Sequence, residues 1–116
     1  AHATSTGRVL LAAKSGRDFQ AWMKGRELTR LTAHTVVDSR QFRQLIAAVR
    51  AQDWCVASEE HELGVHALAV PLRNMEGSTV AALNVVAPPE RLEARVLHKA
   101  LLPLLQDAAR ELRPLL

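Results

Sequence analysis

The sequence has a single cysteine, Cys55, and no run of about 18 uninterrupted apolar residues of the kind that crosses a membrane. One cysteine excludes an internal disulfide, and this agrees with a reducing compartment. The N-terminus does not carry the basic region and following hydrophobic run of a secretory signal. From these absences we expect a cytoplasmic protein without a membrane partner.

Low-complexity tracts and internal repeats are also absent, and the composition (48% hydrophobic and 23% charged residues) is that of an ordinary globular chain. A length of 116 residues closes one hydrophobic core but not two, so we expect one domain over residues 1–116. The formal net charge is +3, but the arginines are spread singly along the chain. We interpret them as solvated helix faces rather than as a stripe that binds nucleic acid.

Motifs that carry catalysis are missing as well. The sequence contains no glycine-rich phosphate loop, no nucleophile elbow and no metalloprotease helix. Ser5 or Ser58 could pair with a histidine as nucleophile and base, but such combinations occur in nearly every chain. We therefore predict no catalytic residue, no cofactor and no enzyme activity.

Cys55, His61 and His66 lie in one short region and have side chains that can bind transition metals. Their spacing favours a structural role, because a free thiol on a strand is usually a small buried hydrophobe and the two histidines flank a loop glycine. The acidic residues nearby are interpreted mainly as a solvated turn: Glu59, Glu60 and Glu62. We predict no metal site.

Hydrophobic spacing predicts short helices over residues 5–14 and 18–24. In the first helix, Val9, Leu10 and Ala13 should form the apolar face, and Gly16 should end it. A third helix is predicted over residues 39–52, because Asp38 followed by Gln41 is an N-terminal capping signature. Its apolar stripe consists of Phe42, Leu45, Ile46 and Val49.

The second half of the chain changes to strand-like patterns. Strands are predicted over residues 54–58, 65–72 and 79–86, the last two forming an antiparallel hairpin around a turn at 74–77. The strand over 65–72 is apolar on both faces and should be covered on both sides. Two prolines should then open a long helix over 90–112, kinked at Pro103.

The stretch from Arg50 to Val85 carries the residue order of a known family. It runs Arg50-Ala51-Gln52-Asp53-Trp54, Glu59-Glu60, Gly64, Ala67-Leu68-Ala69-Val70-Pro71-Leu72, Asn74, Gly77 and Ala81-Ala82-Leu83-Asn84-Val85. This order resembles the C-terminal effector-binding domain of the IclR family of bacterial transcription regulators. In that family a glutamate stands seven residues before a small residue, which is followed by an aliphatic residue, a small residue and, five further on, Asp or Asn. The matching residues here are Glu60, Ala67, Leu68, Ala69 and Asn74.

Similarity extends over nearly the whole chain. Gly7-Arg8-Val9-Leu10-Leu11-Ala12 resembles the helix that opens this part of the family domain, and the region around Pro103-Leu104 and Ala108-Ala109 resembles its closing helix. Leu31-Thr32-Ala33-His34-Thr35, with Trp54, Arg73 and Asn84, is similar to the regulators of protocatechuate and 4-hydroxybenzoate catabolism.

The resemblance implies an α+β, GAF-like sensor domain in which an antiparallel sheet packs with helices and the C-terminal helix is long. Family members carry a winged helix-turn-helix, a linker helix and further strands ahead of the helix at Gly7, and residues 1–116 contain none of these parts. DNA is therefore expected as a partner only through that absent N-terminal region, while the chain itself is expected to form a homodimer or tetramer.

Carried over position by position, the family's effector pocket would be lined by seven residues: Ser5, Thr6, Ala57, Val65, Ala67, Asn84 and Val86. Ser5, Thr6 and the backbone amides around Gly7 offer donors for a carboxylate, so we expect an aromatic or small organic acid as effector. Glu60 and Gly64 are interpreted as holding the turn between strands, with Gly64 at a positive φ and Glu60 outside the pocket.

Three positions depart from the family pattern: Asp53, where Gly or Ala is usual; Ala57, where Asp or Ser is usual; and Arg73, where an aromatic residue or His is usual. The loss of a polar group at Ala57 removes a hydrogen bond to the effector, for which Ser58 is a candidate substitute. Two other hypotheses stay open. The chain could be an association module with a vestigial pocket, using the helices over 39–52 and 90–112, or a small metal-dependent enzyme.

Overall fold

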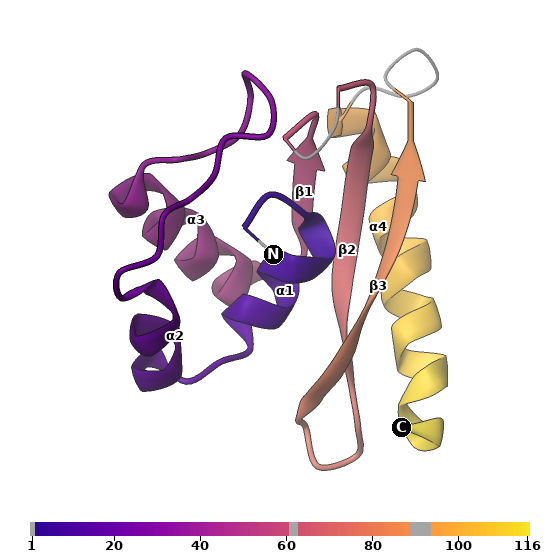
Figure 1. The fold of residues 1–116 in the computed structure, drawn as a ribbon. Helices are drawn as coiled ribbons and strands as arrows, with labels where there is room; N and C mark the ends of the chain where they lie inside the picture. The colour runs from indigo at the N-terminus through magenta and orange to yellow at the C-terminus, as the bar shows by residue number, and fades with distance from the viewer. Residues whose placement is uncertain (1, 61–62, 89–93) are drawn as a thin grey trace.

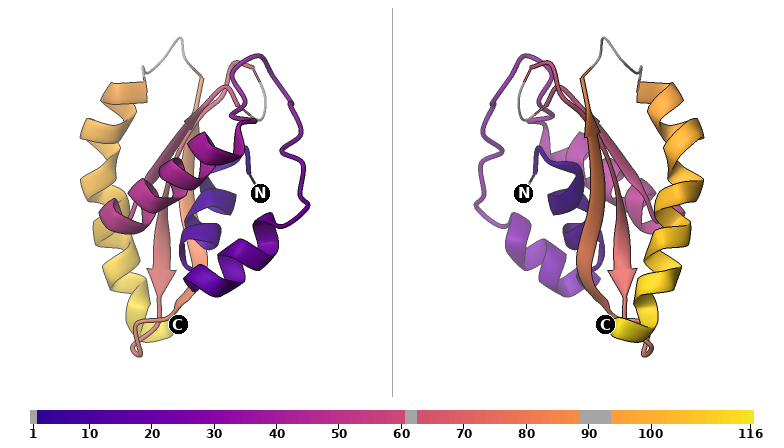
Figure 2. Two further views of the ribbon diagram at one scale, coloured as in Figure 1. Left: turned by 90° about the vertical axis from the view of Figure 1, so that its left-hand side faces the viewer. Right: turned by 90° about the vertical axis from the view of Figure 1, so that its right-hand side faces the viewer.

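The computed structural model describes residues 2–60, 63–88 and 94–116. Within these residues the helices are α1 (Ser5–Ala12), α2 (Gly16–Met23), α3 (Ser39–Gln52) and α4 (Ala94–Leu112), followed by the 3₁₀ turn η1 (Arg113–Leu115). The strands are β1 (Cys55–Ser58), β2 (His66–Arg73) and β3 (Thr79–Ala87), which form an antiparallel sheet in the order β1-β2-β3. α1, α2 and α3 lie on one side of the sheet and α4 on the other (Figures 1 and 2). The predicted α+β class is confirmed.

Side-chain caps fix where the first three helices begin. The carboxylate of Asp38 accepts a 2.8 Å hydrogen bond from the amide of Gln41, and α3 has the predicted bounds. Thr4 caps α1, which ends at Ala12, two residues earlier than predicted. Gly16 does not end a helix, because Ser15 is a cap and Gly16 is the first residue of α2.

The predicted apolar face of α1 was only partly right. Val9 is buried, but Leu10 is 44% exposed and Ala13 is exposed. The residues that α1 buries are Ser5, Arg8, Val9, Leu11 and Ala12. The reason is that α1 packs against α3 as well as against the sheet, so a single apolar stripe does not define its buried surface.

β2 and β3 form the predicted hairpin. Gly77 has φ +86°, and the side-chain oxygen of Asn74 accepts from the amides of Glu76 and Ser78, at 3.1 and 3.0 Å. The strands pair from His66 opposite Ala87 to Leu72 opposite Ala81, with an irregularity before Arg73. This register sets which β3 side chains share a face with those of β2.

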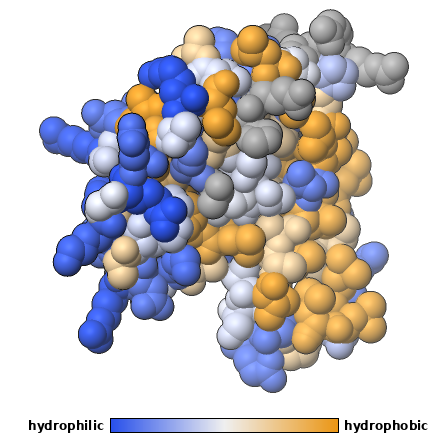
Figure 3. Space-filling view, in the orientation of Figure 1, coloured by the Kyte–Doolittle hydropathy of each residue, from blue (hydrophilic) through white to orange (hydrophobic). Residues whose placement is uncertain are grey.

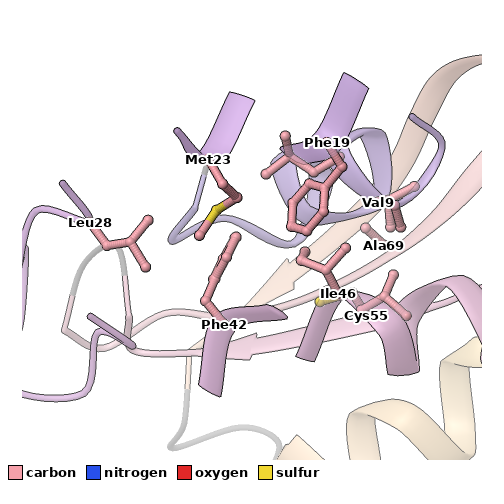
Figure 4. Close-up of a cluster of buried hydrophobic side chains, with 11 residues drawn as sticks. Val9, Phe19, Met23, Leu28, Phe42, Ile46, Cys55 and Ala69 are labelled. Carbon is pink, nitrogen blue, oxygen red and sulfur yellow. The ribbon is translucent and has the colours of Figure 1, made fainter. Parts of the chain in front are cut away.

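The main hydrophobic core lies between the sheet and α1–α3 (Figure 4). Phe42 and Ile46 of α3 and Ala69 of β2 are almost completely buried there. On the opposite face Leu68 and Val70 are also buried, and α4 packs against β2. β2 is therefore covered on both sides, as predicted from its two apolar faces.

α4 contacts all three strands. The ring of His98 stacks on that of Trp54, with the centroids 4.0 Å apart. The predicted start of this helix at Glu90 lies outside the described residues, and the kink expected at Pro103 stays a prediction. Within the described part of the chain, no helix combines the length and apolarity that crossing a bilayer requires.

Candidate functional site

A cavity of about 180 Å³ lies between the N-terminal end of α1 and the sheet. Its lining contains all seven residues expected to form an effector pocket, together with two that were not expected: Thr4, Ser5, Thr6, Ala57, Glu60, Val65, Ala67, Asn84 and Val86. The fold thus brings residues near the N-terminus together with residues of all three strands. Their role in binding an effector stays a prediction.

Strand register explains the sheet wall of this cavity. Ala57 on β1 lies opposite Ala67 on β2, and Ala67 lies opposite Val86 on β3, so the three form one row across the sheet. Asn84 is two residues from Val86 and therefore faces the same side. The two alanines leave room that larger side chains would fill. Val86 is 54% exposed, so the wall is open to solvent at the β3 edge.

The opposite wall is the first turn of α1. The hydroxyl of Thr4 accepts from the amide of Gly7 at 3.0 Å. The Gly7 amide was expected to donate to the cavity, but it is already used by this helix cap. The amides of Ser5 and Thr6 precede the first intrahelical hydrogen bond, which runs from Arg8 to Thr4. With the positive end of the helix dipole, they provide donors for an anion.

Below the cavity lies a buried ion pair that sequence reasoning missed. Arg8 is 0% exposed, and its two Nη groups donate to the carboxylate oxygens of Glu60, with Nη1 2.7 Å from Oε2. The Nε of Arg8 donates to the carbonyl of His2 at 2.7 Å. Arg8 lies inside α1 and was given no role beyond its place in the family's residue order, because a sequence does not reveal a partner 52 residues away.

Glu60 lines the cavity, contrary to the prediction, and its bonds tie the turn after β1 to α1 and to the segment before α3. The amide of Val36 donates to its Oε1 at 3.2 Å, and the hydroxyl of Thr35 donates to its carbonyl. The bonds across the turn are made by Glu59 instead, whose amide donates to the carbonyl of Val65 at 2.8 Å and whose Oε1 accepts from the amide of Gly64 at 3.1 Å. Gly64 has φ +80°, as expected for that turn. Because Arg8 neutralises Glu60, the cavity does not present an uncompensated negative charge.

The profile of the C-terminal region of bacterial IclR transcriptional regulators matches residues 1–113. This chain belongs to the IclR family. It is 47% identical over 116 residues to the Pca operon regulatory protein of Acinetobacter baylyi, and the match covers 100% of this chain and 42% of that protein. It is 44% identical over 115 residues to the p-hydroxybenzoate hydroxylase transcriptional activator of the same organism, covering 99% and 42%.

A solved relative agrees with this assignment. The inducer-binding domain of the Acinetobacter transcription factor PobR, a double mutant in complex with 3-hydroxy benzoic acid, superposes with a TM-score of 0.94. The two chains are 44% identical, and the match covers 99% of this chain and 66% of that one. The resemblance to the protocatechuate and 4-hydroxybenzoate regulators is confirmed. The chain spans 42% of the length of the two regulators named above.

One departure from the IclR pattern is now located. Ala57 lies in the cavity wall, and Ser58 does not replace its missing polar group. Ser58 is paired with His66, and consecutive residues of a strand point to opposite faces, so its side chain lies on the α4 side of the sheet. The suggestion that Ser58 serves the pocket was wrong.

The other two departures contact each other. Arg73 donates to both carboxylate oxygens of Asp53, at 2.9 and 3.2 Å. Neither residue lines the candidate cavity. Asp53 follows α3 and has φ +65°, a left-handed conformation that glycine adopts most readily.

The possible metal ligands do not form a cluster in the described part of the chain. Cys55 is buried in the core on the α1 side, opposite Ala69, whereas His66 lies three residues before Ala69 on β2 and therefore faces α4. The pair therefore lies on two faces of the sheet, while His61 lies outside the described residues. Burial raises the pKa of the Cys55 thiol, and the nearby Arg8 opposes this increase.

Proposed function

We propose that this chain is the ligand-sensing domain of an IclR-type transcription regulator and that the cavity beside α1 binds a small, preferably aromatic, carboxylic acid. The observation that carries the proposal is the meeting of hydrogen-bond donors and an apolar wall in one cavity. The complex of the related PobR domain with 3-hydroxy benzoic acid supports the class of ligand.

The chemistry of the two walls suggests how such an acid would bind. Its carboxylate would accept from the amides of Ser5 and Thr6, where the helix dipole favours a negative charge. The ring would lie on the row formed by Ala57, Ala67 and Val86. A cavity of about 180 Å³ is smaller than the roughly 300–1,000 Å³ pockets of drug-sized ligands, which favours a single ring.

A ring hydroxyl would find polar partners at the sides of the cavity. Asn84 offers an amide that donates and accepts, and Glu60 offers a carboxylate that accepts. These side chains replace the polar group that is missing at Ala57. In the longer regulator, binding would shift the population of domain arrangements and so alter how paired DNA-binding domains engage an operator. No catalytic step is part of this proposal.

Titration calorimetry of the chain with 4-hydroxybenzoate, protocatechuate, 3-hydroxybenzoate and adipate tests the proposal. We expect saturable heat with at least one acid and a matching rise in Tm, because a ligand at 100 times its Kd stabilises the folded state by about 2.7 kcal/mol. Benzamide and benzyl alcohol are the neutral controls and should bind much more weakly. Absence of heat and of any Tm change with every acid would contradict the proposal.

We also propose self-association, as a homodimer or tetramer. Apolar residues gather on the side of the molecule where β3 and α4 lie, whereas the side of α2 and α3 is largely hydrophilic (Figure 3). Val80 and Val86 on β3 and Leu104 on α4 are at least half exposed. Sedimentation velocity over a range of concentrations tests this, and a chain that stays monomeric at high concentration would contradict it.

A further inference from the structure

A second hollow, of about 230 Å³, lies at the hairpin end of the sheet, between β2 and the C-terminal part of α4. In Figure 1 this is the lower end of the molecule, where the C-terminus also lies. Its lining has no residue in common with the candidate cavity: Asp53, Val70, Pro71, Arg73, Gln106, Ala109, Arg110 and Arg113. We call it the hairpin-end hollow.

Three guanidinium groups line this hollow, against one carboxylate. Arg73 is held by both oxygens of Asp53, and Arg110 donates to Asp107 one turn away on α4. Arg113 donates through Nε to the carbonyl of Asn74 at 3.0 Å. These bonds restrict the arginines but use only part of their donors, since each guanidinium carries five N–H groups.

The charge at this site is positive after pairing. Three arginines against Asp53 and Asp107 leave an excess of one positive charge around the hollow. A smaller neighbouring hollow of about 30 Å³ shares Asp53, Pro71 and Arg73 and adds Arg50. Arg50 donates only to carbonyls among the described residues, those of Ala12 and Lys14, and so adds a cation that no carboxylate neutralises.

The rest of the lining is apolar except for the side-chain amide of Gln106. Val70, Pro71 and Ala109 contribute side chains without hydrogen-bonding groups, with most of the accessible apolar surface coming from Pro71 and Ala109 because Val70 is only 1% exposed. An apolar floor with arginines around it suits an anion that also has a hydrophobic body, whereas a bare inorganic ion would leave the floor in contact with water. Arginine forks bind carboxylates with two parallel hydrogen bonds.

We propose that the hairpin-end hollow is a second binding site, distinct from the cavity beside α1, for a small organic carboxylate with an apolar body. A ligand there would contact the end of α3, β2, α4 and η1 at once. It would therefore stabilise the packing of the C-terminal part of α4 against the sheet. Binding of a carboxylate at this site would therefore not require a ligand in the cavity beside α1.

NMR titration of the ¹⁵N-labelled chain with benzoate and with adipate tests this site, with NaCl used to keep the ionic strength constant. We expect saturable shifts at Gln106 and Ala109 in the natural chain. They should persist in Ala67→Phe, which fills the first cavity. In the double variant Arg110→Gln/Arg113→Gln the affinity at these residues should fall about tenfold or more, because two charged donors are lost.

The double variant Arg17→Gln/Arg40→Gln is the matched control. It removes two exposed arginines outside the hollow and should retain the natural affinity. The proposal is overturned if NaCl alone gives the same shifts, if neither acid shifts Gln106 or Ala109, or if both double variants weaken binding equally. Loss of these shifts in Ala67→Phe would also overturn it, because the two sites would then be one.

Discussion

The guanidinium of Arg8 and the carboxylate of Glu60 form a buried, bidentate ion pair directly below the cavity beside α1, with Nη1 of Arg8 2.7 Å from Oε2 of Glu60. The pair joins α1 to the turn that follows β1. Glu60 lines the cavity while Arg8 does not, so the arginine acts on the site by holding Glu60 and by neutralising it.

Replacing Arg8 by methionine is expected to destabilise the chain by about 3–5 kcal/mol, because it leaves a buried carboxylate without its cation. The free energy of unfolding in urea measures the effect. Arg73→Met is the matched control, since it breaks an ion pair whose side chains are 38% and 50% exposed and should cost about 1 kcal/mol or less. The double variant Arg8→Met/Glu60→Met should recover much of the loss. Equal costs for Arg8→Met and Arg73→Met would contradict this account.

The regular elements could be predicted because their signals are local. The Asp38 cap fixed the start of α3, and Gly77 fixed the hairpin turn. The cavity residues were predicted through the family's residue order, not through periodicity. Residue order does not reveal long-range pairing, so the partnership of Arg8 with Glu60 was missed. The error at Ser58 was avoidable, because strand alternation alone places it on the face opposite Ala57.

The thiol of Cys55 should make the stability of the chain depend on alkaline pH. Burial raises its pKa in the folded state, so above the ordinary pKa of about 8.5 the unfolded chain has lost a proton that the folded chain keeps. The contribution of the buried, protonated thiol to the free energy of unfolding is complete below the ordinary pKa and is lost as pH rises through the folded-state pKa. In that window stability should fall by at most about 1.4 kcal/mol per pH unit.

Urea unfolding of the natural chain and of Cys55→Ala between pH 7.5 and 10.5 measures this contribution. The variant is expected to be less stable at neutral pH, because a buried group is removed, and to lose less stability as pH rises. The lysines are common to both proteins, and the chain has no tyrosine, so the difference between the two slopes isolates the thiol. Parallel slopes would show that burial does not alter this titration.

Asp53 combines an unusual backbone conformation with an exposed ion pair. At φ +65° glycine fits without strain, whereas alanine lacks both that freedom and the carboxylate. We expect Asp53→Ala to be less stable than Asp53→Gly by about 1–2 kcal/mol, while Asp53→Gly stays within about 1 kcal/mol of the natural chain. Thermal and urea unfolding of both variants measure the difference. Equal stability of the two variants would mean that the left-handed backbone carries no cost here.

Filling the cavity beside α1 should remove binding without unfolding the chain. Ala67 is half-buried at the centre of the sheet wall, and a phenylalanine there would occupy the space that we propose for the ring of the ligand. In the background Arg110→Gln/Arg113→Gln, which weakens the hairpin-end hollow, Ala67→Phe is expected to lose the heat of acid binding and to keep its Tm within a few degrees, because strands accept aromatic residues well. Val80→Phe introduces the same ring at an exposed position of β3 outside the cavity and should bind normally. Undiminished binding by Ala67→Phe would place the acid elsewhere.

The amide of Ser5 allows the most direct test of where a carboxylate binds. Ser5 is the first residue of α1, and Thr4 before it has φ −112° and ψ 148°, the extended conformation that a following proline requires. Ser5→Pro therefore removes one backbone donor and the hydroxyl while the helix is retained, whereas Ser5→Ala removes the hydroxyl alone. We expect Ser5→Pro to bind acids about tenfold or more weakly than Ser5→Ala, because a hydrogen bond to a charged group is lost. Calorimetry with both variants measures the ratio, and circular dichroism checks that α1 is intact. If the two variants bind acids equally well, the first turn of α1 does not hold the carboxylate, and the donors must be sought at Asn84 instead.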